Sequence, residues 1–288
     1  MSVSRRQMLK LGAGAAAMCV AGAQLPLRAA AATPGKIPIG LGLNSLVHGK
    51  WQLPELLKAV AGMGYEAVAL AHHSLLGLIT DAPTWKKLLD QNGLKCCGQH
   101  VALNEDLEGD QLQPMVARCK LLGTPYLIIR SVSKQNFASV AAILGTTKRL
   151  NAISANLKPH GMKLGYLCQP GDFAKIEGSK TLWEVIGENT SPDFIMQLDT
   201  RNCAAGHADP VAMLKKFPGR AQTVVLREHG GKPGAVVGEG HVDWKGVFEF
   251  CETAGGTKQY VVEVDGGGSP EALKIVARAL KNLRKMGK

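Results

Sequence analysis

The chain has 288 residues, of which 45% are hydrophobic and 20% charged, and its formal net charge is +11. This composition excludes a disordered or collagen-like chain and is that of an ordinary globular protein. The basic residues form no Lys/Arg block and do not alternate with aromatic residues. The positive charge therefore does not indicate a nucleic-acid partner.

Residues 1–32 have the pattern of an export signal. Arg5 and Arg6 precede an apolar run rich in Ala and Gly over residues 11–27, and residues 29–32 offer A-x-A cleavage sites. The paired arginines resemble a twin-arginine signal. The apolar run is short and rich in glycine for a membrane anchor. We expect export to the periplasm or beyond, with no stable membrane anchor after cleavage near Thr33.

Residues 33–288 are expected to form one large domain, because no Pro/Ser-rich linker divides them. Removing the signal takes away four basic residues and no acid, so the charge falls to about +7. The cysteines that remain include no C-x-x-C pair, which gives no support to a zinc knuckle. Most of them lie within apolar patterns, so we predict buried thiols.

Short apolar runs alternate with segments of helical periodicity along this domain. Strands are predicted at residues 36–43, 66–71, 94–101, 126–130, 163–168, 194–198, 223–227 and 259–264. Helices are predicted at residues 53–63, 82–92, 114–122, 136–160, 181–188, 210–217, 243–254 and 270–286. Eight strand–helix units predict a (β/α)8 TIM barrel. The alternative is a doubly wound sheet, but Gly40 and Gly42 lack the third glycine of a nucleotide-binding loop.

The chemistry of such barrels lies at the carboxyl ends of the strands. Asp199 follows the sixth predicted strand, and Glu263 and Asp265 close the eighth. Other polar residues at strand ends are His72, His73, His100, Arg130, Gln169, Asp172, Asn202, Arg227, Glu228 and His229. A rim with acids, bases and cations is suited to sugar recognition and proton transfer. Alternatively, the acids are solvated or cap helices.

The segment after Asp199 is expected to be a loop of small residues, with Asp209 and Pro210 opening the next helix. The loop over residues 227–243 holds five glycines. Its place after the seventh strand predicts a mobile lid that faces the substrate.

Several short stretches resemble one family of barrels. They are residues 63–68 (MGYEAV), 92–101 (NGLK…GQHV), 160–166 (HGMKLGY), 208–210 with 218–220 (ADP…PGR) and 237–244 (VGEG…VDW). Together they resemble the xylose isomerase-like TIM-barrel superfamily, in the branch of sugar phosphate isomerases/epimerases and the AP-endonuclease family 2 domain. The resemblance covers nearly all of the chain after the signal. It implies a barrel that acts on a sugar or sugar derivative.

The resemblance also implies four metal ligands at the ends of the fifth to eighth strands. Asp199 and Glu263 match two of them, whereas Leu167 and Val225 stand at the other two. Leucine and valine cannot bind a hard cation. We therefore expect at most weak binding of Mn²⁺, Mg²⁺ or Zn²⁺ by Asp199 and Glu263.

The function expected from the resemblance is isomerisation or epimerisation of a sugar or sugar derivative. Asp199 and Glu263 would be the catalytic acid–base pair next to a carbonyl, and a metal or another cation would stabilise the enediolate. The residues expected to bind substrate are His100, Gln169, Arg227, His229, Lys232 and Asp265. Gln169 or His229 could also complete a metal shell.

Two alternatives remain open. One is a lyase that acts on oxidised sugars through the same first step, and the other is a non-catalytic carbohydrate-binding barrel. Endonuclease activity at abasic sites needs a dense cluster of metal ligands, which this rim lacks. The expected partner is a small-molecule sugar, and the sequence does not indicate an oligomeric state.

Overall fold

The computed structural model describes residues 36–46, 51–71, 81–104, 107–176, 180–265 and 271–288. The expected signal over residues 1–32 and its cleavage site lie outside these ranges, as do His72 and His73. No helix within the described ranges is both long and apolar enough to cross a membrane.

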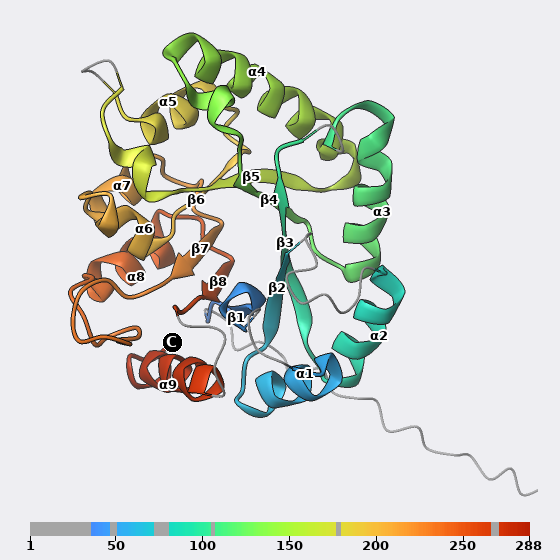
Figure 1. Ribbon diagram of the computed structural model, residues 1–288, viewed down its shortest axis with the longest axis vertical. Helices are drawn as coiled ribbons and strands as arrows, with labels where there is room; N and C mark the ends of the chain where they lie inside the picture. The colour runs from blue at the N-terminus through green and yellow to red at the C-terminus, as the bar shows by residue number, and fades with distance from the viewer. Residues whose placement is uncertain (1–35, 47–50, 72–80, 105–106, 177–179, 266–270) are drawn as a thin grey trace, which may run out of the picture. The chain divides into compact units, whose positions relative to one another are not determined.

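Eight parallel strands form the centre of the fold (Figure 1). They are β1 (Ile39–Gly42), β2 (Ala67–Ala71), β3 (Lys95–Ala102), β4 (Tyr126–Ser131), β5 (Lys163–Leu167), β6 (Ile195–Gln197), β7 (Thr223–Leu226) and β8 (Gln259–Val262). β1 pairs with both β2 and β8, so the sheet curves round until β6 and β7 meet. A parallel bridge between Asp199 and Val225 joins those two ends. The predicted (β/α)8 TIM barrel is confirmed.

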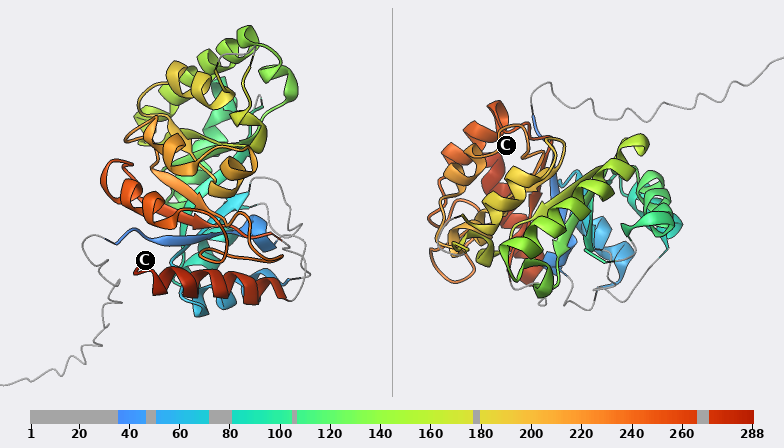
Figure 2. Two further views of the ribbon diagram at one scale, coloured as in Figure 1. Left: turned by 90° about the vertical axis from the view of Figure 1, so that its left-hand side faces the viewer. Right: turned by 90° about the horizontal axis from the view of Figure 1, so that it is seen from above.

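The helices lie outside the strands, as Figure 1 and the two further views in Figure 2 show. They are α1 (Leu53–Gly62), α2 (Ala82–Gln91), α3 (Leu112–Leu122), α4 (Val140–Leu157), α5 (Leu182–Asn189), α6 (Thr200–Ala205), α7 (Pro210–Lys215), α8 (Trp244–Thr253) and α9 (Glu271–Lys285). Asp81 and Asp209 each accept a hydrogen bond from the first turn of the helix that follows. Aspartate N-caps were therefore reliable markers of helix starts.

The loop predicted after Asp199 is wrong in its first part, which forms the short helix α6. The Asp199 side chain accepts hydrogen bonds from the backbone N–H groups of Arg201 and Asn202 at 2.9 and 3.1 Å. These bonds satisfy donors that have no partner within the helix. A run of small residues suggested a loop, but an effective N-cap made it helical.

Alternation along the strands divides the apolar side chains into two clusters. The inner one fills the barrel and consists of Ala67, Ala69, Cys97, Ile128, Leu167, Ile195, Val225 and Val261. The outer one lies between the strands and the helices, and Cys96 belongs to it. The six cysteines described are all buried and free, as predicted. Burial raises the pKa of each thiol, which keeps the thiols neutral and unreactive.

Candidate functional site

A ring of polar side chains lies at the carboxyl ends of the strands, just beyond the inner apolar cluster. Inward-facing positions recur every second residue, so Val225 and Val261 of the cluster are followed by Arg227 and Glu263. The members of this polar ring are Asn44, His100, Arg130, Gln169, Asp199, Arg227 and Glu263. The structure thus brings five residues of the predicted site to one rim.

Glu263 is buried and is held by Arg130. The two guanidinium nitrogens of Arg130 donate to the two carboxylate oxygens at 2.7 and 3.1 Å. Gly42 makes room for this side chain, because a Cβ there would stand 2.6 Å from Cγ of Glu263. Burial alone would raise the pKa of Glu263, but Arg130, His100 and Arg227 together hold it below its ordinary value. Glu263 is therefore a fixed anion.

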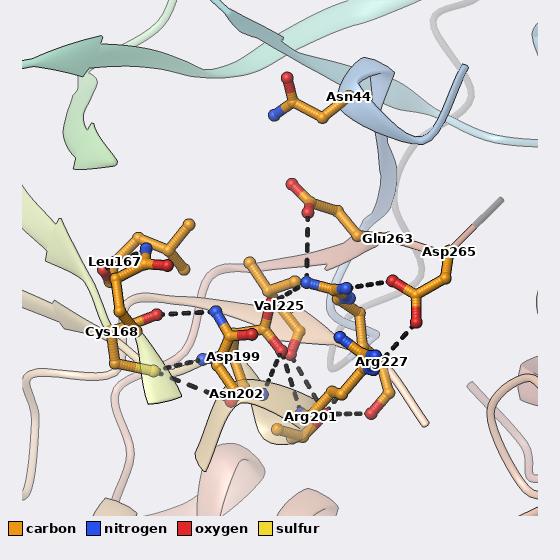
Figure 3. Close-up of polar contacts among 12 residues, drawn as sticks. Asn44, Leu167, Cys168, Asp199, Arg201, Asn202, Val225, Arg227, Glu263 and Asp265 are labelled. Atoms are coloured by element: carbon orange, nitrogen blue, oxygen red, sulfur yellow. Dashed lines mark hydrogen bonds and ion pairs between the residues drawn. The ribbon is translucent and has the colours of Figure 1, made fainter. Parts of the chain in front are cut away.

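Arg227 lies between acids from two neighbouring strands (Figure 3). Its Nη1 is 2.9 Å from Oδ2 of Asp199 and 4.0 Å from Oε2 of Glu263. Its Nη2 donates to the more exposed Asp265, which also pairs with Arg201. The two buried carboxylates therefore lie within about 7 Å of each other. Burial opposes the charge of Arg227, but these acids raise its pKa.

Both oxygens of Asp199 are occupied. Oδ1 caps α6, and Oδ2 accepts the hydrogen bond from Arg227. Burial raises the pKa of Asp199 and Arg227 opposes that rise, with a net shift above the ordinary value. The pKa values of Asp199 and Glu263 are thus displaced in opposite directions.

Next to Glu263, a group of polar atoms is buried without a hydrogen-bond partner. They are Asn44 Oδ1, His100 Nε2, Gln197 Oε1 and Arg227 Nε. The Nδ2 of Asn44 is 3.5 Å from Nδ1 of His100, so these groups are close neighbours. Burial lowers the pKa of His100 to about 4, and the imidazole is neutral at physiological pH. Donors and acceptors left in this way are suited to ligand hydroxyl groups.

Sequence reasoning missed Asn44 and Gln197. Gly42 precedes Asn44 by two residues, and Gln197 precedes Asp199 by two, so each lies on the inward face of its segment. Applying the period of two outward from Asp199 could have found Gln197. Asn44 follows the end of β1, where the alternation is harder to extend.

A family model for the xylose isomerase-like TIM barrel matches residues 57–286. The chain belongs to this family. No protein of curated function matches the chain.

Solved structures share the fold of the chain over most of its length. A sugar phosphate isomerase/epimerase from Parabacteroides distasonis ATCC 8503 has a TM-score of 0.71 at 19% identity, over 87% of this chain and 98% of that one. D-psicose 3-epimerase from Clostridium cellulolyticum H10 has a TM-score of 0.64 at 12% identity, over 86% and 99%. The probable 3-DHS dehydratase AsbF from Bacillus anthracis has a TM-score of 0.62 at 16% identity, over 86% and 99%. At these identities the likeness shows the fold.

The residues present do not fit the four-ligand metal site that the family resemblance implies. Leu167 and Val225 are fully buried members of the inner apolar cluster. The carboxylate oxygens of Asp199 and Glu263 already accept hydrogen bonds from Arg227, Arg130 and the start of α6. Within the described ranges, no group of three His, Cys, Asp or Glu side chains could hold a metal ion.

The other predicted substrate-binding residues are less closely involved. The Gln169 amide donates to the backbone carbonyls of Arg130 and Leu167 at 3.2 and 3.3 Å, and so ties two strand ends together. Lys232 is exposed and His229 half-buried, and no side-chain hydrogen bond or ion pair joins either to the polar ring in the described structure. Their predicted roles remain predictions.

The loop after β7 is folded around the buried Glu228. That carboxylate accepts hydrogen bonds from the backbone of His229, Gly238 and Val242 and from Nε1 of Trp244, at 2.8–3.2 Å. Asn282 of α9 also donates to the carbonyl of residue 237 at 3.0 Å. A loop held at its start, middle and end is a fixed wall, which differs from the mobile lid suggested by its glycines.

Proposed function

We propose that the protein is an isomerase or epimerase of a sugar or sugar derivative and moves a proton next to a carbonyl group. The observation that carries the proposal is the pair of buried carboxylates, Asp199 and Glu263, with the guanidinium of Arg227 between them. Carboxylates serve as proton acceptors and donors, and a fixed cation stabilises the enediolate that forms when the proton leaves. The presence of sugar isomerases and epimerases among the structural neighbours supports this reading.

The two carboxylates have different roles. A base must hold the proton during the intermediate stage, which favours the group whose pKa is raised. That group is Asp199, whose pKa burial raises. Glu263, whose pKa is held low, remains an anion and orients Arg130 and a substrate hydroxyl group. Arg227 stabilises the negative charge that develops on the substrate oxygen.

The unpartnered polar atoms support a polyhydroxylated substrate. Asn44 and Gln197 offer carbonyl oxygens that accept hydrogen bonds, and Arg227 offers an N–H that donates one. The neutral His100 can do either, according to its tautomer. Adjacent hydroxyl and carbonyl groups of a sugar match such a mixture. This part of the site would hold the substrate while Asp199 reacts with it.

The test is exchange of the substrate proton with solvent. A panel of sugars, sugar phosphates and sugar acids is first screened by thermal shift, and each ligand found is incubated with the protein in D₂O. Nuclear magnetic resonance should show deuterium entering at the carbon next to the carbonyl. Asp199→Asn should slow this exchange by about 10²–10⁴-fold. Asp172→Asn changes a buried acid outside the polar ring and should leave the exchange rate unchanged. Wild-type exchange rates in Asp199→Asn would contradict the proposal.

A carbohydrate-binding barrel without activity is the second candidate. It is favoured by the complete pairing of Asp199 and Glu263 with donors, because a paired carboxylate is a weaker base. A ligand that binds and shows no deuterium exchange would support this function. A lyase would instead release an unsaturated product, which absorbs in the ultraviolet.

The proposed cellular location is the periplasm or another exported compartment, reached through the twin-arginine pathway. Arg5, Arg6 and the apolar residues 11–27 support it. N-terminal sequencing of protein recovered from periplasm should give a start near Thr33. Replacing both arginines by lysine should retain the protein in the cytosol, and unchanged export would contradict the pathway.

A further inference from the structure

We propose that this site operates without a divalent cation and that the guanidinium group of Arg227 takes the place of one. A metal ion that bridges Asp199 and Glu263 would stand about 2–2.6 Å from an oxygen of each. The Nη1 of Arg227 stands between them, at 2.9 Å from one carboxylate and 4.0 Å from the other. The position that a bridging cation needs therefore holds a nitrogen of the chain itself.

The donors around the two acids leave little for a cation to bind. Arg130 takes both oxygens of Glu263, while Arg227 and two backbone N–H groups take those of Asp199. A metal ion would have to displace two guanidinium groups to gain carboxylate ligands. Hydrogen bonds between ionised groups in buried surroundings are the strong ones, so this displacement is costly.

The wall of the site is also wrong for a metal. Val225 is bridged to Asp199 in the sheet, so its isopropyl group lies level with the carboxylate. Leu167 belongs to the same apolar cluster. An ion held here would contact hydrocarbon where a hard cation requires oxygen or nitrogen ligands.

The charges of the network are already balanced. Three acids, Asp199, Glu263 and Asp265, are paired with Arg130, Arg201 and Arg227. Adding a divalent cation would leave an excess of positive charge in a largely buried site. The positive charge needed to polarise a substrate oxygen is therefore supplied by a fixed guanidinium. For its catalytic meaning this inference rests on the proposed function, but the exclusion of the cation does not.

The geometry narrows the ligand class to sugars that present an oxygen to a guanidinium N–H. Arg227 uses Nη1 and Nη2 on the acids, and Nε is buried without a partner. A carbonyl or enediolate oxygen accepts such a hydrogen bond. Chelating pairs of hydroxyl groups, which metal-dependent sites favour, gain nothing from it.

The experiment measures Mn²⁺ binding in the absence of any sugar. Full-length wild-type protein is dialysed against EDTA and then titrated with Mn²⁺, and the free ion is followed by electron paramagnetic resonance. We expect no stoichiometric binding below about 1 mM, which is weaker than ordinary protein sites for hard cations. Arg227→Met removes the guanidinium between the acids and should strengthen Mn²⁺ binding at least about tenfold, since two buried carboxylates then lack their cation.

The matched control is Arg201→Met, which removes an arginine that pairs with Asp265 and leaves Arg227 in place. It should bind Mn²⁺ as weakly as the wild type. Circular dichroism checks that both variants fold, and the wild-type titration tests the proposal even if one of them does not. One equivalent of Mn²⁺ bound by the wild type at about 10 μM would overturn the proposal. So would Arg227→Met binding no more tightly than Arg201→Met.

Activity provides an independent result. If a sugar substrate is found, EDTA should leave kcat/KM unchanged within about twofold, and a loss of activity that Mn²⁺ restores would overturn the inference. If no substrate is turned over, the proposed function fails while the titration still decides whether the cation is excluded.

Discussion

Glu263 and Glu228 are both buried carboxylates at the carboxyl ends of neighbouring strands, but their charges are satisfied by different partners. Glu263 faces the inside of the barrel and is paired with the guanidinium groups of Arg130 and Arg227. Glu228 faces outward and accepts N–H groups from the loop that follows it and from Trp244. Burial and charge are alike in the two residues, so the nature of the partners distinguishes their roles.

Side-chain partners can be exchanged for a ligand, whereas backbone partners cannot. Arg130 is 31% exposed and can turn to solvent or substrate without disturbing the strands. The N–H groups around Glu228 belong to the loop itself, and removing their acceptor leaves them unsatisfied. The comparison therefore assigns Glu263 to binding and Glu228 to structure, and the following predictions test that division.

The largest effect is expected for Glu228→Ala. Loss of a carboxylate that satisfies four N–H groups should lower the free energy of unfolding by about 3–5 kcal/mol. Urea unfolding measures this loss, and limited proteolysis should show new cleavage near Lys232. The matched control is Glu239→Ala, an acid of the same loop whose ion pair with Arg278 is partly exposed. It should cost about 1 kcal/mol or less. Equal losses in the two variants would contradict the structural role of Glu228.

Asp172 sharpens the comparison because it is buried beside no cation. It accepts hydrogen bonds from the Tyr166 hydroxyl and the Gln169 backbone N–H, and burial raises its pKa to about 6. Since the folded-state pKa lies above the unfolded value of about 3.9, wild-type stability falls as the pH rises from about 4 to 7. Asp172→Asn removes this dependence.

The difference in unfolding free energy between Asp172→Asn and wild type should therefore shift in favour of the variant by about 2 kcal/mol between pH 4 and pH 7.5. Urea unfolding at both pH values provides the measurement. Taking the difference cancels the titration of all other groups. A difference that does not change with pH would show that Asp172 is not buried as an ionised acid.

A smaller effect on stability is expected for Glu263→Gln. Arg227 keeps Asp199 and Asp265 as partners, and Arg130 can reach solvent, so the loss at pH 7 should be about 1–2 kcal/mol. The pKa of Glu263 is held low in the fold, so this contribution is present above pH 4.5 and is lost as the pH falls below the folded-state value. Binding of any ligand found for the site should weaken by more than stability does. A variant that is much less stable but binds normally would reverse the division of roles.

The strand–helix repeat and part of the polar ring could be predicted from sequence because both follow from periodicity. Asp199, Arg227 and Glu263 stand one step of two beyond apolar inward positions, so a strand assignment places them at the rim. The sequence could not show that Arg227 lies between the two acids, since this depends on side-chain conformations across three segments far apart in the chain. Nor could the glycines of residues 227–243 reveal that Glu228 holds them.

Lys232 provides the smallest effect and tests the loop from its surface. Its charge and position led to the prediction that it binds substrate, but the side chain is exposed and makes no described hydrogen bond or ion pair. If the loop is a wall held by Glu228, Lys232→Ala should change the free energy of unfolding by less than about 0.5 kcal/mol. It should also leave ligand affinity within about twofold, because an exposed cation is screened by solvent and salt. Isothermal titration with a ligand of the site measures the affinity. A loss of tenfold or more would mean that this part of the loop moves onto the ligand, and would restore the lid as the better description.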